Sequence, residues 1–188
     1  VYYLPSVTSG VAISMLWIWI FNPEFSLLNY FLSMVGITGP AWLFDPKWVL
    51  PAFIIMSLWG LGSTTIIYLA GLQGIPQSLY EAAEIDGAND WNKFWRVTLP
   101  LMTPVIFFNL VVGIIGNFQV FAPALIMTKG GPQDATLFMV LAIYRNAFEY
   151  SKIGYAAALS WLLFVIIVAL TFAQFRFSGR WVYYEAEE

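Results

Sequence analysis

Apolar residues run along the chain in four long blocks, which are separated by polar connections. The blocks cover residues 4–21, 49–72, 101–121 and 153–175. Each is long enough to cross the roughly 30 Å hydrocarbon core of a bilayer as a helix. Apolar residues occupy every face of the blocks instead of alternating, so the pattern predicts helices and not the strands of a membrane barrel. The expected fold is an all-α, polytopic transmembrane bundle of about four spans.

Four crossings place both ends of the chain on one side of the membrane, together with the connection at residues 73–98. The other two connections, at 22–48 and 122–152, then lie on the opposite side. Lys and Arg mark the cytoplasmic side of membrane proteins, but each side carries four of the eight basic residues. Their distribution therefore does not orient the chain. Within the first connection, residues 27–35 are too few to span and predict an interfacial or packed helix.

Composition narrows the possible functions. Only 10% of the residues are charged and 60% are hydrophobic, against about 25% charged residues in an average soluble domain. The net charge of −3 gives no basic patch for nucleic acid. The chain has no His and no Cys, which excludes His-based triads, thiolate nucleophiles and Cys/His zinc sites. These absences leave few routes to an enzyme, so we expect a membrane protein with no catalytic residue, metal or cofactor.

The connection at residues 73–98 carries the clearest helix signals. Ser78 followed three residues later by Glu81 is a capping box, which predicts a short helix that begins at Leu79. The helix should end near Asp86, because Gly87 can adopt the left-handed conformation that closes a helix. A helix of this length is not stable alone in water, so it must pack against something.

A second short helix should follow the first and lead into the third apolar block. Asn89 or Asp90 can cap this second helix, and Pro100 can open the block where a missing N–H costs little. The residues alone leave two interpretations open. Either the connection is a capped membrane-surface hairpin with Glu81 as a local cap, or it docks in a groove of another protein.

The spacing in this connection resembles a family signature. Glu81-Ala82-Ala83, Gly87 and the segment at 97–100 match in spacing the pattern EAA–x3–G–x9–I–x–L–P of binding-protein-dependent ABC importer permeases, with Val97 in place of Ile. Segments such as LAGLQGIP at 69–76 and MTKGGP at 127–132 resemble the maltose-type carbohydrate branch, and in particular the first of its two membrane subunits. The resemblance covers nearly the whole chain.

The resemblance implies a single transmembrane permease domain over residues 1–188, in a bacterial or archaeal inner membrane. Such permeases usually have six or more spans, so we expect that the first two helices are missing. The implied function is to form the path for a sugar or related solute by alternating access. The implied partners are a second permease subunit that completes a heterodimer, two copies of an ABC ATPase subunit and an extracytoplasmic solute-binding protein. The connection at 73–98 and the C-terminus would be cytoplasmic.

ATP hydrolysis is expected on the separate ATPase subunit, because the chain contains no GxxxxGK[ST] phosphate loop. By resemblance, the first short helix is a coupling helix that seats in a cleft of that subunit, with Glu81 paired to a basic residue there. The expected ATPase-coupling residues are Glu81, Ala82, Ala83, Gly87, Leu99 and Pro100.

Polar residues inside a span are costly unless they face other protein or water. Asn109 lies on one face of the third block with Gly113 and Gly116. Glycines at such positions favour close helix packing. Amides and aromatic rings near the outer end of the block suit a sugar, although hydrogen bonding between helices is an equally open reading. The expected substrate path consists of Asn109, Asn117, Phe118, Gln119 and Phe121.

The outer connection holds a turn by composition, with Gly130, Gly131 and Pro132. By resemblance, these three residues lie where the binding protein docks. Beyond the turn, Arg145 is interpreted as part of a solvated helix face. The alternative function is a subunit of a secondary transporter or channel, which would be expected to carry a carboxylate within a span. Every Asp and Glu falls outside the four blocks.

Overall fold

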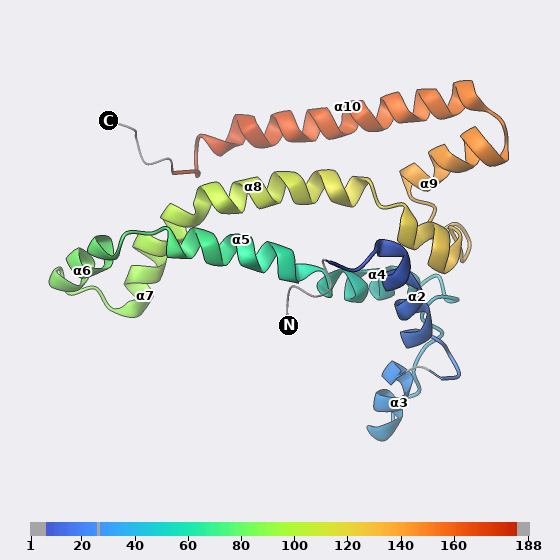
Figure 1. The fold of residues 1–188 in the computed structure, drawn as a ribbon, viewed down its shortest axis with the longest axis horizontal. Helices are drawn as coiled ribbons and strands as arrows, with labels where there is room; N and C mark the ends of the chain where they lie inside the picture. The colour runs from blue at the N-terminus through green and yellow to red at the C-terminus, as the bar shows by residue number, and fades with distance from the viewer. Residues whose placement is uncertain (1–6, 26, 184–188) are drawn as a thin grey trace. The chain divides into compact units, whose positions relative to one another are not determined.

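Helices make up the regular secondary structure of the part of the chain that the structure describes, which is residues 7–25 and 27–183 of a computed structural model (Figure 1). The all-α fold is confirmed, since these residues form no strand. The α-helices are α2 (Gly10–Ile20), α3 (Leu27–Met34), α4 (Val49–Leu58), α5 (Leu61–Gln73), α6 (Gln77–Ile85), α7 (Asp90–Lys93), α8 (Leu99–Phe118), α9 (Met139–Tyr144) and α10 (Ile153–Ser178). Three π-helical turns accompany them: η1 (Phe94–Thr98), η2 (Ala124–Thr128) and η3 (Arg145–Glu149).

Among the described residues, two helices are long and apolar enough to cross a membrane by themselves. One is continuous from Asp90 to Phe118 through α7, η1 and α8, and the other is α10. The pair α4 and α5 makes a third candidate if the two helices are counted as one span. In the first predicted block, the described residues form α2, an apolar helix of 11 residues. Most of α10 is exposed in this chain, as expected for a helix that faces lipid or another subunit.

The second predicted span is broken between α4 and α5, which the block pattern did not indicate. The two helices are bent by 43°. At the break, the N–H of Trp59 donates to Met56 O and the N–H of Gly60 donates to Ser57 O, at 3.1 Å in each case. These are the tighter three-residue bonds that end a helix. A nearby Gly and Ser are a frequent cause of such a kink.

The chain divides into two compact units, of which unit 1 consists of Val1–Gly62 and Gly116–Val165. Its core contains two apolar clusters. The first is formed by Trp17, Phe21, Trp42, Leu43 and Ala52. The second, formed by Val49, Phe53, Ala124 and Leu141, brings α4 together with η2 and α9.

The helix α3 confirms the prediction of a short helix at residues 27–35, and it has no buried residue. Its Asn29 holds the returning chain: Trp42 Nε1 donates to Asn29 Oδ1 at 2.7 Å. A side chain at Gly39 would overlap the Asn29 amide. The small residue at position 39 therefore allows the return segment to lie directly on α3.

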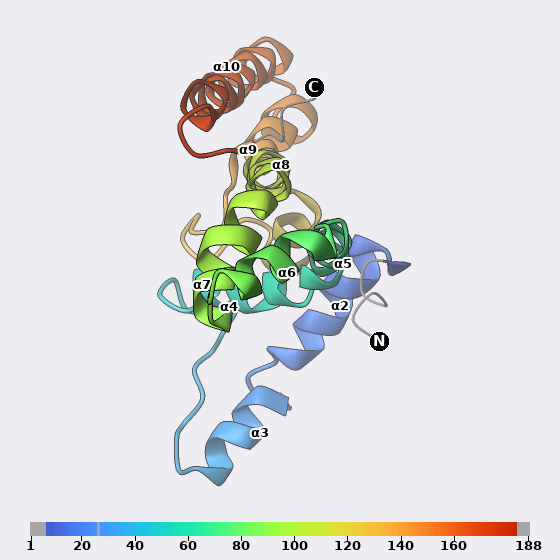
Figure 2. The same ribbon diagram turned by 90° about the vertical axis from the view of Figure 1, so that its left-hand side faces the viewer.

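Unit 2 consists of Ser63–Ile115 and Ile166–Glu188. In it, α5 packs closely on α8, because a Cβ at Gly71 would lie 2.9 Å from Val105 Cγ2. The N–H of Tyr183 donates to Thr103 Oγ1 at 2.8 Å, and the rings of Phe107 and Phe175 pack edge to face with centroids 5.0 Å apart. The short helices α6 and α7 lie side by side as a hairpin in both views (Figures 1 and 2).

Candidate functional site

The α6–α7 hairpin begins two residues earlier than the sequence predicted, and the capping box is wrong. The helix α6 starts at Gln77 with Pro76 at its N-cap, and no side chain caps it. Ser78 lies inside the first turn and so cannot serve as the N-cap. The fixed φ of proline explains the difference, because Pro76 (φ −60°, ψ 131°) sets the extended entry from which the helix starts.

The end of α6 confirms the prediction for Gly87, which has a φ of +79°. The N–H of Ala88 donates to Ala83 O and the N–H of Gly87 donates to Glu84 O, both at 2.9 Å. This pair of bonds, with a left-handed glycine between helix and turn, is a Schellman motif. Two carbonyls of the last turn, those of Ala83 and Glu84, are thereby satisfied without another protein.

The second arm of the hairpin is continuous with the third span. Asn89, and not Asp90, is the N-cap of α7: its Oδ1 accepts from the N–H of Asn92 at 2.9 Å. The helix then widens into η1 and passes into α8, where the N–H of Leu99 donates to Phe94 O. Pro100 therefore lies within a continuous helix and does not open it, which corrects the prediction. The wide turn just before Pro100 is where a helix can yield to the carbonyl clash of proline.

Two side-chain links tie the arms of the hairpin together. Lys93 Nζ lies 2.8 Å from Glu84 Oε1 and 2.8 Å from Asp90 Oδ1. Tyr80 Oη and Thr98 Oγ1 are hydrogen-bonded at 2.9 Å. Neither link was expected from the sequence, although the charges of Glu84 and Lys93 were visible there.

The ion pairs also shift the protonation of their members. The continuous helix Asp90–Phe118 has 29 residues, against the about 20 that a bilayer core requires, so its charged first turns extend outside the hydrocarbon. There the hydrogen bond from Lys93 lowers the pKa of the Asp90 carboxyl. Hydrogen bonds to Asp90 and Glu84 in turn raise the pKa of the Lys93 amine. Asp90 and Lys93 are therefore both charged at neutral pH.

The outer surface of α6 is open. Glu81 and Ala82 are exposed, while Ala83 is half-buried under the closing turn. Ile85 is 87% exposed, which is exceptional for a large apolar side chain, and Leu79 is 37% exposed. The sequence analysis missed Ile85. Its position four residues after Glu81, on the same face of the helix, was the available signal.

The residues of the expected substrate path are not held in one cluster. Asn109 Nδ2 donates to Val105 O at 2.8 Å, within its own helix. Asn117 and Phe118 are exposed at the end of α8, and Gln119 is exposed in the turn that follows. Phe121 packs against Tyr144 with ring centroids 5.2 Å apart.

The glycines expected to allow close helix packing, Gly113 and Gly116, have no close neighbour in the part of the chain that the structure describes, whereas Gly71 does. A Cβ at Gly113 or Gly116 would have no heavy atom within 4 Å among the neighbours described. Gly71 of α5, in contrast, lies against side chains of α8.

The outer turn is a compact, internally bonded structure. Gly130 is buried with a φ of +80°. Thr136 is fully buried, and its Oγ1 is hydrogen-bonded to Thr128 Oγ1 at 2.6 Å. The Thr136 hydroxyl also lies within donating distance of Gly131 O, at 2.8 Å. Gly131 and Pro132 are half-buried. The glycines thus form the framework of the turn.

Arg145 braces this turn and is not part of a solvated helix face. Its Nη2 donates to the carbonyl oxygen of Lys129, and its Nε lies 3.6 Å from a carboxylate oxygen of Glu149. The exposed side chains of the turn are those of Lys129, Gln133 and Asp134. All three residues have positive φ values, between 47° and 58°, so the backbone that presents them is tightly defined.

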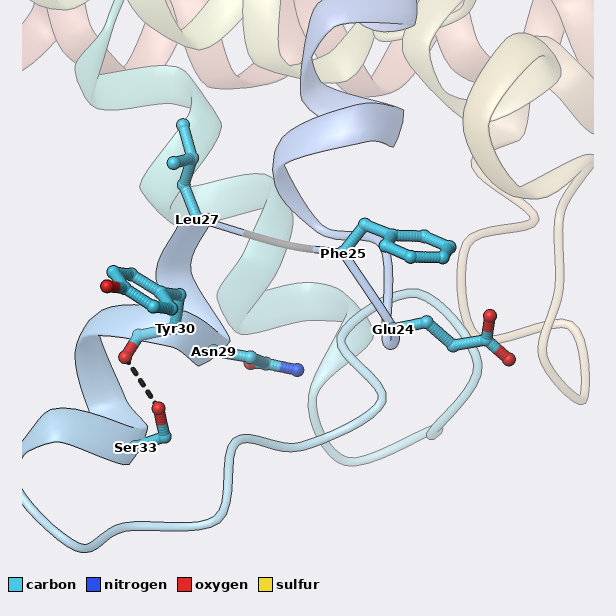
Figure 3. A pocket seen from close by; sticks show the side chains of 6 residues that line it. All are labelled: Glu24, Phe25, Leu27, Asn29, Tyr30 and Ser33. Atoms are coloured by element: carbon cyan, nitrogen blue, oxygen red, sulfur yellow. Dashed lines mark hydrogen bonds between the residues drawn. The ribbon is translucent and has the colours of Figure 1, made fainter.

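A separate hollow of about 560 Å³ lies beside α3 and is lined by Glu24, Phe25, Leu27, Asn29, Tyr30 and Ser33 (Figure 3). Its side chains do not converge. Phe25 and Tyr30 point to opposite sides in Figure 3, and Ser33 Oγ donates to the backbone oxygen of Tyr30 at 2.7 Å. Because the Asn29 amide and the Ser33 hydroxyl already have partners within the chain, we do not assign this hollow to a solute.

Membrane-length helices joined by a capped, exposed hairpin define a helical integral membrane protein. Residues 1–183 match the family described as binding-protein-dependent transport system inner membrane component, and the chain belongs to this family. The sequence is 43% identical over 191 residues to the probable ABC transporter permease protein YesP of Bacillus subtilis, which covers 100% of this chain and 62% of that protein. It is 39% identical over 182 residues to the lactose transport system permease protein LacF of Rhizobium radiobacter, with 92% and 60% covered.

A solved structure is also similar. One chain of the crystal structure of a bacterial ABC transporter involved in the import of the acidic polysaccharide alginate superposes with a TM-score of 0.84 at 28% identity. The match covers 95% of this chain and 63% of that chain. The chain therefore spans about 60% of the length of the relatives that it matches.

Proposed function

We propose that this chain is a permease subunit of an ATP-driven ABC importer and forms part of the translocation path for a sugar or related solute. The observation that carries the proposal is the α6–α7 hairpin. It has the family spacing, it is closed by its own hydrogen bonds, and it presents Glu81, Ala82 and Ile85 to solvent. A preformed helix with an exposed apolar residue and a carboxylate suits a cleft with a basic rim.

The proposed partners are two copies of an ABC ATPase subunit, a second permease subunit and an extracytoplasmic solute-binding protein. The hairpin and the C-terminus would then be cytoplasmic, and α3 and the outer turn extracytoplasmic. Relatives support these assignments, since one similar structure is described as an alginate ABC transporter in complex with a periplasmic protein that binds an alginate pentasaccharide.

The proposed mechanism is a shift of population between inward- and outward-facing states. ATP binding closes the ATPase pair and displaces the two docked hairpins, which favours the outward-facing arrangement. Ala82, Ala83 and Gly87 allow α6 to seat closely, while Glu81 pairs with a basic residue of the cleft. Leu99 and Pro100 lie where the continuous helix passes from η1 into α8, so displacement of the hairpin acts directly on a membrane-spanning helix.

For the solute, we propose contacts near the outer end of α8. The exposed amides of Asn117 and Gln119 and the ring of Phe118 can hydrogen-bond and stack on a sugar. Asn109 and Phe121 complete the proposed path. The four apolar blocks at residues 4–21, 49–72, 101–121 and 153–175 contain no Lys or Arg, which favours a neutral solute. Relatives with an anionic cargo include the sn-glycerol-3-phosphate permease UgpA of Agrobacterium fabrum, 37% identical over 183 residues.

The outer turn at Gly130, Gly131 and Pro132 is the proposed docking place of the binding protein. Gly130 is buried, so the contact would be made by Lys129, Gln133 and Asp134, whose side chains the glycine framework presents.

Glu81→Lys in the assembled importer tests the proposed function. The expected result is loss of the ATPase subunit on purification, or loss of ATP-dependent uptake in proteoliposomes. Glu24→Lys, the same charge change at an exposed residue of unit 1, should leave both unchanged. Normal uptake and normal co-purification of the Glu81→Lys protein would refute the coupling role. Gradient-driven flux without ATP in the parent protein would instead support the secondary transporter.

A further inference from the structure

One hydrogen bond joins the two ends of the hairpin. Tyr80 lies on α6 directly before the Glu-Ala-Ala segment, and Thr98 is the last residue of η1, directly before α8. Tyr80 Oη and Thr98 Oγ1 are 2.9 Å apart, and both side chains are half-buried. The bond therefore connects the exposed helix to the base of the third span across 18 residues of chain.

The covalent route between the same two points is long, and at two places its backbone departs from α-helical geometry. It passes the left-handed turn at Gly87, which has nothing within 4 Å of a Cβ, and then η1. π-helical turns are rare and frequently occur at functional sites, and they are one of the recognised places where a helix kinks. Lys93 also links the arms, but it binds Glu84 upstream of η1. Of the two side-chain links described, only the Tyr80–Thr98 bond reaches the end of the π turn that adjoins α8.

Thr98 also contacts the backbone of the π turn, since its Oγ1 lies 3.5 Å from Lys93 O. A hydroxyl carries one proton, so Thr98 can donate to that carbonyl only if Tyr80 donates to Thr98. In that arrangement, a chain of hydrogen bonds runs from Tyr80 on α6 through Thr98 to the carbonyl oxygen of Lys93, at the start of the π turn. Tyr80 supplies the first donor and Thr98 is the joint.

We propose that Tyr80 and Thr98 are positioning residues that make α6 and the start of α8 move as one body. The proposal rests on the proposed function, because it concerns how displacement of a docked α6 reaches the translocation path. Without the bond, the π turn would absorb part of the displacement. A single net hydrogen bond changes a two-state equilibrium by about fivefold, which is enough to be seen in a distance distribution.

The test uses spin labels on the assembled importer in lipid nanodiscs. The chain has no cysteine, so Gln77→Cys on α6 and Val112→Cys on α8 label two exposed positions without background from this chain. Distances are measured by pulsed electron resonance without nucleotide and with ATP plus vanadate. A second label pair, between an ATPase subunit and Gln77→Cys, reports whether α6 remains docked.

In the parent, the Gln77–Val112 distance should stay the same when ATP and vanadate are added, because the two helices move together. In Tyr80→Phe and Thr98→Val, a second distance should appear on adding ATP and vanadate, in a population about fivefold above that in the parent. Thr98→Ser retains the hydroxyl and should behave as the parent. The ATPase-to-α6 distance should be the same in all four proteins.

An unchanged distance distribution in Tyr80→Phe and Thr98→Val would overturn the proposal, as would a Thr98→Ser protein that behaves like Thr98→Val. Loss of the ATPase subunit in both variants, with retention in Thr98→Ser, would assign the bond to docking and also overturn it. A purely structural role would lower the melting temperature without a nucleotide-dependent second distance. Failure of the parent itself to bind an ATPase subunit would refute the proposed function, and is thus distinguishable.

Discussion

Replacement of Gly87 isolates the contribution of one backbone conformation to the hairpin. Gly87 has a φ of +79°, and a Cβ added there would have no heavy atom within 4 Å. Gly87→Ala therefore adds no clash and removes no side-chain contact. Its whole effect on the hairpin comes from the cost of holding an L-residue in the left-handed region.

That cost is about 1–2 kcal/mol for alanine, which corresponds to an about 5- to 30-fold smaller ratio of closed to open hairpin. Asparagine visits the same region more readily, because its short polar side chain bonds locally. Gly87→Asn should therefore lose distinctly less than Gly87→Ala. The two bonds that depend on this turn are those from the N–H groups of Gly87 and Ala88 to Glu84 O and Ala83 O.

Hydrogen exchange measured by mass spectrometry on a peptide that covers residues 83–89 is the assay. Exchange should be about 5- to 30-fold faster in Gly87→Ala, with Gly87→Asn between it and the parent, while peptides from α10 are unchanged. Binding of the ATPase subunit should weaken in the same order, because an open hairpin must be ordered before it docks. Equal exchange in the parent and Gly87→Ala would refute the argument, since no other contact of residue 87 could compensate.

Three further changes test other parts of the structure. Gly71→Ala places a methyl 2.9 Å from a methyl of α8, so crowding of about 1–3 kcal/mol should exceed the gain of about 1 kcal/mol in helix propensity. Gly113→Ala has no such neighbour and should only stabilise the protein. Unfolding of the two variants in detergent compares their stabilities. Arg145→Ala should destabilise the outer turn by about 1.5–3 kcal/mol, read as faster exchange at residues 128–136 and weaker binding of the solute-binding protein. Asn117→Ala with Gln119→Ala should raise the solute concentration for half-maximal ATPase stimulation about tenfold or more, and no shift would remove these amides from the path.

Features of the hairpin that depend on local chemistry could be predicted from the sequence. The closing role of Gly87 needs only its missing Cβ, and the capping role of Asn89 needs only an amide oxygen within reach of the next turn. The predicted start of α6 at Leu79 was wrong because two helix-start signals, Pro76 and Ser78, compete there. Pro76 comes first and fixes its own φ, so Ser78 was already inside the helix. Pattern alone gives no rule for which of two adjacent signals prevails.

Features that depend on contacts distant in the chain could not be predicted. The bonds of Tyr80 with Thr98 and of Arg145 with Lys129 join residues 18 and 16 positions apart. The π turns and the break before Leu61 leave the apolar pattern unchanged, because they alter the bond register and not the residue types. Gly71 was indistinguishable in the sequence from other glycines of the spans until its neighbour on α8 was known.

The family spacing and the exposed surface of α6 give different information about the same helix. Ala83 and Gly87, which carry the spacing, are used inside the hairpin: one provides the carbonyl that the closing bond reaches, and the other the left-handed turn. Ile85, which the spacing does not include, has the most open large side chain of the helix. A partner that distinguishes this permease from a related one would therefore contact Ile85 and its neighbours. Ala83 and Gly87 ensure that a helix is present to be contacted. Exchange of Ile85 should change the choice of ATPase subunit at constant hairpin order, whereas exchange of Gly87 should change both.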